Sequence, residues 1–335
     1  MSPANPPILY VRLPNWVGDV CMSLPSLEAL LAADLPLVVC ARPWARDFLG
    51  AYPLAGFVAM DASWRRNRKA LLGSRAEYPG QRPLGLLLPD SLSSALSFRL
   101  AGIPSAGYRD DGRSLLLRWP IRKPTQALHA VQSWYHLTRQ AMAHWKLSVP
   151  AAEPAAELHW RAAESHGTAT TLAMAQAGLT PGHFVLIAPT ATGLHKGRVK
   201  VWAHFDALTR ALQAQGHTVV MAPPAAEQAA ARRAAPSATL MPALGLGAFA
   251  VLTHRAALVI CNDSGVSHLA AAAGARQITL FGVTRPARTG PWSSRALRLG
   301  QWQNWPALDE VVSVAQTQLA ETLHARVFAG PQQSG

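Results

Sequence analysis

Short apolar runs alternate with segments of helical spacing along most of the chain, and the alternation resumes in its second half. Apolar runs predict strands at residues 8–13, 35–41, 57–60, 84–88, 106–108, 184–188, 218–221, 258–260 and 277–281. Helical spacing predicts helices at residues 20–31, 43–50, 91–100, 125–145, 162–177, 202–215, 227–235, 266–273 and 308–328. This alternation is typical of parallel sheets covered by helices. We therefore expect an α/β protein with two Rossmann-like domains.

The boundary between the halves is expected in residues 148–157, which are rich in Pro and Ala and have no periodicity. A chain of 335 residues is also long for a single core. We predict an N-terminal domain at residues 1–150, a C-terminal domain at 151–307 and a final helical segment at 308–335 that packs back on the first domain. Ligands bind outside the carboxyl ends of such strands, so the two domains are expected to face a central cleft.

Residues 259–275, VICNDSGVSHLAAAAGA, read as a strand, a polar turn and an Ala-rich helix. The turn carries Asn262, Asp263, Ser264 and Gly265, and the helix carries His268. A helix that begins after such a turn presents N–H groups and the positive end of its dipole, which suits a phosphate. The alternative is that Asp263 or Ser264 only caps the helix.

A second strand–turn–helix near the N-terminus ends in Gly18 and Asp19. Glycine allows close approach of a ligand, and a carboxylate facing the cleft can act as general base for a hydroxyl. The alternative is that Asp19 is an ordinary helix N-cap.

The segment at residues 189–202 is a glycine-bearing loop after a strand. It offers hydroxyl groups and cations that suit a departing diphosphate, namely Thr190, Thr192, Lys196, Arg198 and Lys200. The Gly-Lys-Ser/Thr order of a Walker A loop is missing, and a solvated basic loop is the alternative. Glu227 follows the next strand, where an acid can accept hydrogen bonds from ribose hydroxyls.

Composition indicates a folded protein, since 50% of the residues are hydrophobic and 15% are charged. Cys21, Cys40 and Cys261 lie far apart in apolar contexts, as expected of buried thiols in a reducing compartment. We find no signal-peptide pattern and no apolar stretch of transmembrane length, and therefore expect a soluble cytoplasmic protein.

The net charge of +13 suits acidic partners, although a compositional bias towards Arg would produce the same excess. Four cations gather in one short run, Arg65, Arg66, Arg68 and Lys69, which suits a multiply phosphorylated ligand or an anionic surface and equally a solvated face. Nucleic acid is not expected, because the basic residues lack interleaved aromatics. Asp-x-Asp and G-x-G-x-x-G are both missing, so neither a metal-dependent nucleotide-sugar site of that type nor a dinucleotide oxidoreductase is supported.

Three ordered motifs resemble the heptosyltransferases of glycosyltransferase family 9. They are LPNWVGDVCMSLPSL (13–27), TATGLHKGRVKVWAHF (190–205) and CNDSGVSHLAAAAG (261–274), with a weaker fourth match in TLFGVTRPARTGPW (279–292). The first motif is more similar to the second heptosyltransferase of the family than to the first. The resemblance implies a GT-B fold and inverting transfer of heptose from ADP-L-glycero-D-manno-heptose to the lipopolysaccharide inner core, with no cofactor and no obligatory metal.

By this resemblance Asp19 matches the general base and Lys200 the lysine that neutralises the departing diphosphate. The other implied donor contacts are Thr190, Thr192, Lys196, Glu227, Asp263, Ser264, Gly265 and His268. The implied acceptor contacts are Gly18, Arg65, Arg66, Arg68 and Lys69, which would meet a phosphorylated, Kdo-bearing lipid A. The expected protein is a monomer at the inner face of the inner membrane.

Two departures from the family pattern matter. The loop before Trp202 is longer, so Lys196 competes with Lys200 for the phosphate role, and Ala203 replaces the usual Pro. A sugar-nucleotide epimerase on the same fold and a non-catalytic nucleotide-binding protein remain alternatives, because a fold does not dictate its chemistry.

Overall fold

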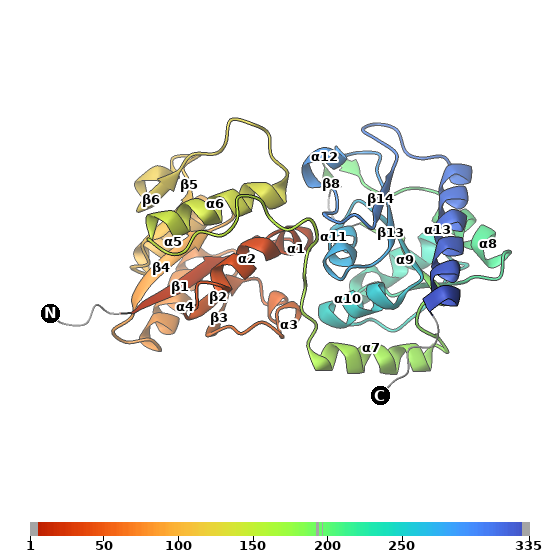
Figure 1. Ribbon diagram of the computed structural model, residues 1–335, viewed down its shortest axis with the longest axis horizontal. Helices are drawn as coiled ribbons and strands as arrows, with labels where there is room; N and C mark the ends of the chain where they lie inside the picture. The colour runs from red at the N-terminus through yellow and green to blue at the C-terminus, as the bar shows by residue number, and fades with distance from the viewer. Residues whose placement is uncertain (1–5, 192–193, 196, 330–335) are drawn as a thin grey trace. The chain divides into compact units, whose positions relative to one another are not determined.

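The computed structural model describes residues 6–191, 194–195 and 197–329. The chain divides into two compact units, Met1–Arg161 and Ala162–Gly335, each built on its own sheet (Figure 1). The division falls after residue 161 rather than at the predicted position 150. One reason is that Trp160 Nε1 donates to the Phe48 carbonyl at 2.7 Å, which ties the residues that follow the expected linker to the first unit.

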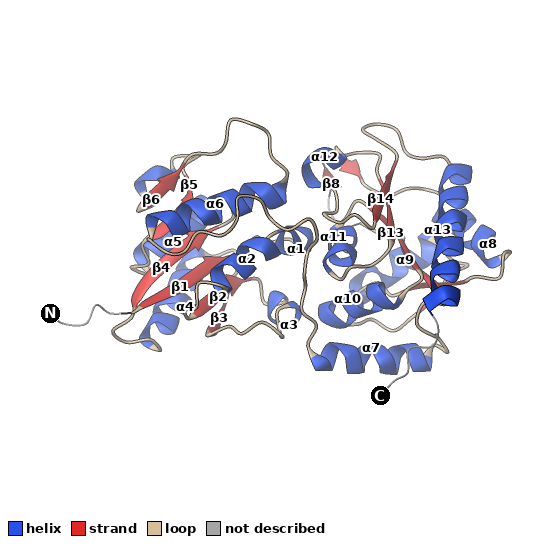
Figure 2. Ribbon diagram, viewed as in Figure 1, coloured by secondary structure: helices blue, strands red, loops and turns tan. Residues whose placement is uncertain are grey.

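The first unit holds a parallel sheet whose six described strands follow the order β3-β2-β1-β4-β5-β6. The strands are β1 (Pro7–Arg12), β2 (Leu37–Ala41), β3 (Gly56–Ala59), β4 (Arg82–Leu87), β5 (Ser105–Tyr108) and β6 (Trp119–Ile121). The helices are α1 (Val17–Met22), α2 (Leu24–Leu31), α3 (Ala45–Phe48), α4 (Trp64–Ala76), α5 (Leu92–Leu100) and α6 (Ala130–His144), with a 3-10 turn η1 (Arg113–Leu115). Leu71 of α4 and Phe98 of α5 pack on the sheet face that carries Tyr10 and Val38. Figure 2 shows the helices of this unit in blue and its strands in red.

The second unit repeats this plan, with six described strands in the order β11-β10-β7-β12-β13-β14. The strands are β7 (Phe184–Ala188), β10 (Thr218–Met221), β11 (Thr239–Leu240), β12 (Leu258–Asn262), β13 (Gln277–Leu280) and β14 (Ala296–Leu299). The helices are α7 (Glu164–Gln176), α8 (Phe205–Gln213), α9 (Gln228–Ala234), α10 (Leu246–Arg255), α11 (Gly265–Ala272), α12 (Pro286–Thr289) and α13 (Leu308–Ala329), with a 3-10 turn η2 (Ala225–Glu227). A separate antiparallel pair joins β8 (Leu194–His195) to β9 (Arg198–Val199).

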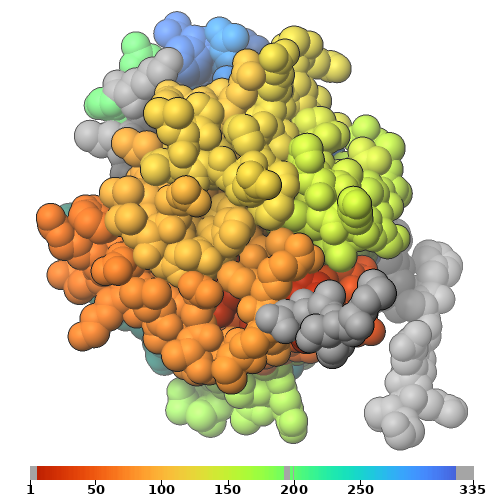
Figure 3. Space-filling view, turned by 90° about the vertical axis from the view of Figure 1, so that its left-hand side faces the viewer, coloured from red at the N-terminus to blue at the C-terminus, as the bar shows by residue number. Residues whose placement is uncertain are grey.

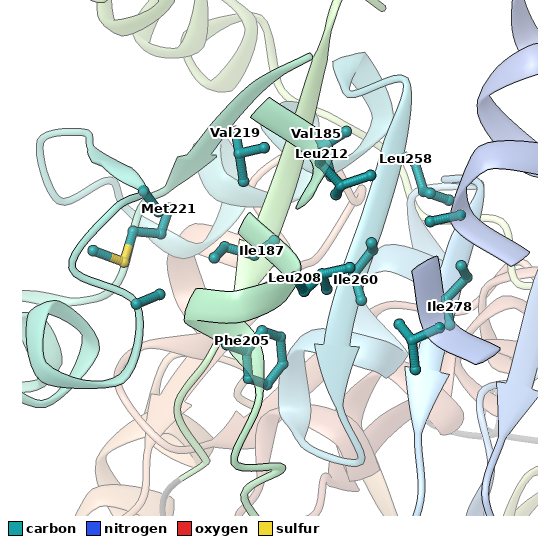
Figure 4. Packing of buried hydrophobic residues seen from close by; sticks show 14 of the residues in the cluster. Val185, Ile187, Phe205, Leu208, Leu212, Val219, Met221, Leu258, Ile260 and Ile278 are labelled. Atoms are coloured by element: carbon teal, nitrogen blue, oxygen red, sulfur yellow. The ribbon is translucent and has the colours of Figure 1, made fainter. Parts of the chain in front are cut away.

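The core of the second unit lies on both faces of its sheet, because successive strand side chains point to opposite sides. Val185 and Ile187 of β7 pack on one face with Phe205 and Leu208 of α8 (Figure 4). The alternating residues of β7 pack on the other face with α7, α10 and α11. Both faces are covered, as the continuous apolar strands of this half predict.

The terminal helix contributes to the core of the second unit. Val311, Ala315 and Leu319 of α13 are buried there, where α13 contacts α8. The packing of residues 308–335 on the first domain stays a prediction. No helix in the described residues, α13 included, is long and apolar enough to cross a membrane.

The single helix expected at residues 20–31 is two helices, α1 and α2, separated at Ser23. Pro25 lies in the first turn of α2, where the N–H that proline lacks would have no partner within the helix. The same residue cannot continue α1, because an interior helix position requires that N–H. The helix expected at 125–145 begins only at Ala130, because His129 Nδ1 accepts from the Val131 N–H at 3.2 Å and caps it. Helices α4, α10 and α12 and the edge strands β6, β11 and β14 were not predicted.

Truncation of Ile260, which is fully buried in β12, tests the core of the second unit. Ile260→Ala should lower the free energy of unfolding by about 2–5 kcal/mol, because it removes apolar contact and leaves a cavity. Leu172→Ala, at a position that is 61% exposed in α7, should change it by less than about 0.5 kcal/mol. Urea unfolding followed by circular dichroism measures both, and equal effects would contradict this assignment of the core.

Candidate active site

Both units have a topological switch point, where neighbouring strands send their chain connections in opposite directions. In the first unit it lies between β1 and β4, and in the second between β7 and β12. The segments that sequence analysis singled out follow these strands: Gly18 and Asp19 follow β1, Thr190 and Lys200 follow β7, and Asp263 follows β12. The candidate site residues of each unit therefore lie at the edge where ligands of such sheets bind.

Asp263 is a buried carboxylate directly after β12, with 6% of its surface exposed. The Thr284 hydroxyl donates to its Oδ2, and Lys200 Nζ lies 3.8 Å from the same oxygen. The Lys200 side chain is 21% exposed, so most of its surface is shielded from solvent. A cation held beside a buried carboxylate is thus available at the carboxyl edge of the second sheet.

Ser264 is the N-cap of α11, since its Oγ accepts from the Val266 N–H at 3.3 Å. The capping alternative is therefore correct for Ser264, whereas Asp263 makes its contacts with Thr284 and Lys200. The helix begins at Gly265, and His268 is buried one turn further on. Capping does not remove the helix dipole, so the positive end of α11 lies next to the Asp263 turn.

Thr190 and Glu227 meet on the β10 side of β7. Thr190 Oγ1 donates to Glu227 Oε2 at 2.5 Å, although the two residues come from separate loops. This bond fixes the orientation of the Glu227 carboxylate, as a residue that binds ribose hydroxyls requires. Two further predicted donor contacts, Thr192 and Lys196, lie outside the described residues.

The loop that carries Lys200 ends on Trp202, a residue that is 2% exposed. The indole Nε1 donates to the Pro306 carbonyl at 2.9 Å, and the ring packs edge-on against Phe205 at 5.5 Å between centroids. The backbone N–H of Trp202 donates to Asn262 Oδ1 at 2.9 Å. These contacts anchor the loop in the core of the second unit.

In the first unit Asp19 lies in the first turn of α1 and is partly exposed. Trp16 holds the N-cap position and makes no capping hydrogen bond through its side chain, so Asp19 is not the cap. Gly18 beside it is buried. A first-turn carboxylate interacts favourably with the positive end of the helix dipole.

Arg12, the last residue of β1, braces the turn before α1. Its side chain is buried and donates to Asn15 Oδ1 at 2.5 Å and to the Leu13 carbonyl. Burial lowers the pKa of the Arg12 guanidinium to about 10, which still leaves it charged at neutral pH. A buried cation therefore supports the segment that leads to Asp19.

The predicted cation cluster forms the start of α4, whose N-cap Ser63 accepts from the Arg66 N–H. Arg66 pairs with Asp61, Arg65 lies 4.7 Å above the Trp64 ring, and Arg68 Nε donates to the Leu100 carbonyl at 3.1 Å. Lys69 is exposed, as are the three arginines. The orange segment that includes α4 forms much of the surface seen in Figure 3.

Residues 80–317, more than half of the chain, match the family model described as glycosyltransferase family 9 (heptosyltransferase). The chain belongs to glycosyltransferase family 9.

Relatives agree with this assignment. The chain is 27% identical to lipooligosaccharide heptosyltransferase 2 of Haemophilus influenzae, over 84% of this chain and 85% of the relative. The solved structure of Escherichia coli ADP-heptose lipopolysaccharide heptosyltransferase II superposes with a TM-score of 0.75 at 23% identity, covering 94% of this chain and 99% of that one. An E. coli heptosyltransferase solved with ADP gives a TM-score of 0.67 at 19% identity, covering 93% and 98%.

The family resemblance drawn from the motifs is therefore confirmed, and the protein is a glycosyltransferase with the two Rossmann-like sheets of the GT-B class. The motif at residues 13–27 lies outside the matched range, so the role of Asp19 stays a prediction. Thr284 and Asn262 are site residues that sequence analysis did not assign. Thr284 belongs to the weak fourth motif, and Asn262 was interpreted as part of a turn although it ends β12.

The cysteines of this family 9 enzyme are free and buried, as predicted. Burial raises the pKa of the Cys261 thiol to about 12, which keeps it protonated and unreactive at neutral pH. Among the described side chains, His, Cys, Asp and Glu form no group of three that could hold a metal ion.

Substitution of Thr284 tests its support of Asp263. Thr284→Val should lower the free energy of unfolding by about 1–3 kcal/mol, because the buried carboxylate loses a charge-assisted hydrogen bond. Thr284→Ser keeps the hydroxyl and should lose clearly less. Urea unfolding measures both variants, and a valine variant as stable as the serine variant would show that the hydrogen bond contributes little.

Proposed function

We propose that this enzyme transfers heptose, with inversion, from ADP-L-glycero-D-manno-heptose to a phosphorylated inner-core acceptor of lipopolysaccharide. Family membership supports the sugar, and the E. coli structure with ADP supports the nucleotide. The observation that carries the proposal is the placement of Lys200 beside Asp263 at the N-terminus of α11. A cation and a helix dipole at one strand end are suited to a diphosphate leaving group.

The second unit is proposed to bind the donor. Lys200 and the start of α11 around Ser264 and Gly265 would face the diphosphate, with His268 behind them. Negative charge grows on the β-phosphate as its bond to the anomeric carbon breaks, and a fixed cation stabilises that charge more in the transition state than in the ground state. We propose that protein groups supply this charge without an obligatory metal or cofactor.

Asp263 has a separate part in this proposal. Its carboxylate would repel a phosphate, but Lys200 and Thr284 lie against Oδ2 and offset the charge. It therefore holds the Lys200 ammonium in position beside the leaving group. Glu227, oriented by Thr190, would accept hydrogen bonds from the ribose. Thr192 and Lys196 remain proposed donor contacts by family resemblance.

The first unit is proposed to bind the acceptor. Asp19 would take the proton from the acceptor hydroxyl while that oxygen forms a bond to the anomeric carbon and ADP leaves from the opposite face. The single displacement inverts the anomeric centre. Gly18 would leave room for the sugar beside the base.

The cations of α4 support a phosphorylated acceptor. Arg65 and Arg66 lie in the first turn of the helix, where positive charge is unfavourable next to the dipole, and Arg68 and Lys69 follow in the second turn. All four side chains are exposed and positively charged, so they are available to an anionic ligand. We propose that these side chains meet the acceptor phosphates, and that the enzyme works as a monomer at the inner face of the inner membrane.

Loss of the proposed base tests the function. Asp19→Asn should reduce heptose transfer to a lipid A–Kdo acceptor by about 10²–10⁴-fold, because the amide cannot accept the proton. Its affinity for ADP should stay within about twofold of the unsubstituted protein, since the donor binds the second unit. Mass spectrometry of the acceptor and calorimetry with ADP measure the two quantities.

The exposed Asp34 supplies the matched control, because Asp34→Asn removes a carboxylate from the same unit and should leave transfer unchanged. Near-normal transfer by Asp19→Asn would refute the assigned base. Conversion of the donor sugar in the absence of acceptor would instead favour the epimerase alternative.

A further inference from the structure

Asn262 occupies a special place in the second sheet. It pairs with Leu280 on the β13 side, but on the β7 side the register ends one residue earlier, with Cys261 opposite Ala188. At Asn262 the neighbouring chain has already left the sheet and entered the loop that carries Thr190 and Lys200. Asn262 therefore has no residue of β7 opposite it, and its side chain contacts the loop that follows β7.

The Asn262 amide contacts both ends of this loop. Its Nδ2 donates to the carbonyl of Ala188, the residue before the loop, at 3.3 Å. Its Oδ1 accepts from the N–H of Trp202, the residue after Lys200 and Val201, at 2.9 Å. Asn262 is fully buried, so neither bond competes with water.

These two partners demand a side chain of a particular kind. The Trp202 N–H needs an acceptor and the Ala188 carbonyl needs a donor, and a primary amide offers both from one planar group. An ionised aspartate offers only acceptors and would leave the Ala188 carbonyl without a donor. A leucine offers neither and would leave both the Ala188 carbonyl and the Trp202 N–H without partners. The two bonds also fix which way the amide faces.

From this geometry we infer that Asn262 is a positioning residue that sets the place of Lys200 relative to Asp263, and so the affinity for a nucleoside diphosphate. Asp263 follows Asn262 directly, and Lys200 precedes Trp202 by two residues. The hydrogen bond from Trp202 to Asn262 therefore joins the two short segments that carry the 3.8 Å pair of Lys200 and Asp263. Without it the end of the loop has more freedom, and the ammonium group is held less often beside the carboxylate.

This inference rests on the proposed donor site, and a double-mutant cycle separates the two. Asn262→Leu should weaken ADP binding by about tenfold, because Lys200 is no longer fixed. In a Lys200→Ala background the same substitution should weaken ADP binding by less than about twofold, because the group that it positions is already missing. Calorimetry with ADP measures all four corners of the cycle.

Thr279→Val provides the matched control for general destabilisation. Thr279 is fully buried on β13, and its hydroxyl donates to Gln277 rather than to the loop. Its substitution should leave the affinity for ADP within about twofold of the unsubstituted protein. If Asn262→Leu does not fold, Asn262→Ala replaces it in the cycle, because it removes both the acceptor for the Trp202 N–H and the donor to the Ala188 carbonyl without adding a charge.

The cycle distinguishes failure of the positioning role from failure of the proposed donor site. Equal losses of affinity in both backgrounds, or an Asn262 variant that binds ADP normally, would overturn the positioning role while leaving the donor site intact. Failure of the unsubstituted protein to bind ADP would overturn the proposed donor, and the positioning role with it.

Discussion

The adjacency of β7 and β12 is the constraint on which the site of the second unit depends. Neither strand carries the chemistry itself, yet the segments that leave them hold Lys200, Asp263 and the start of α11. Parallel pairing places both carboxyl ends at one edge, and the switch point opens space between the loops there. Trp202 in the core and Asn262 at the strand end then join the longer loop to the sheet. Hydrophobic packing thus determines where the charged groups lie.

The two covered parallel sheets could be predicted from the sequence, because the hydrophobic periodicity of each segment agrees with the strand or helix that it forms. Continuous apolar strands such as residues 184–188, alternating with helical segments, predict a covered parallel sheet, and the turn at Asp263 was readable as a helix start. The single helix expected at residues 20–31 was wrong, although Pro25 is a local signal that prevents α1 from continuing into α2. Edge strands such as β11 were missed because two residues carry no usable periodicity.

Contacts between distant segments could not be predicted. Asn262 and Trp202 are 60 positions apart, and Thr190 meets Glu227 across 37 positions. Nothing in the local sequence of either partner specifies the other, because these pairs form only after the strands have assembled. Thr284 was missed for the same reason, since its hydroxyl donates to the carboxylate of Asp263, which lies 21 residues earlier. The family motifs supplied the candidate residues, and the structure supplied their partners.

The central claim is that Lys200, held by Asp263, is the cation that meets the donor diphosphate. Titration of ADP against Lys200→Ala and Lys196→Ala tests it most directly, because both substitutions remove one positive charge from the same loop. We expect Lys200→Ala to weaken ADP binding by about tenfold or more, and Lys196→Ala to stay within about threefold of the unsubstituted protein. The reverse result, with Lys196 carrying the affinity, would contradict it.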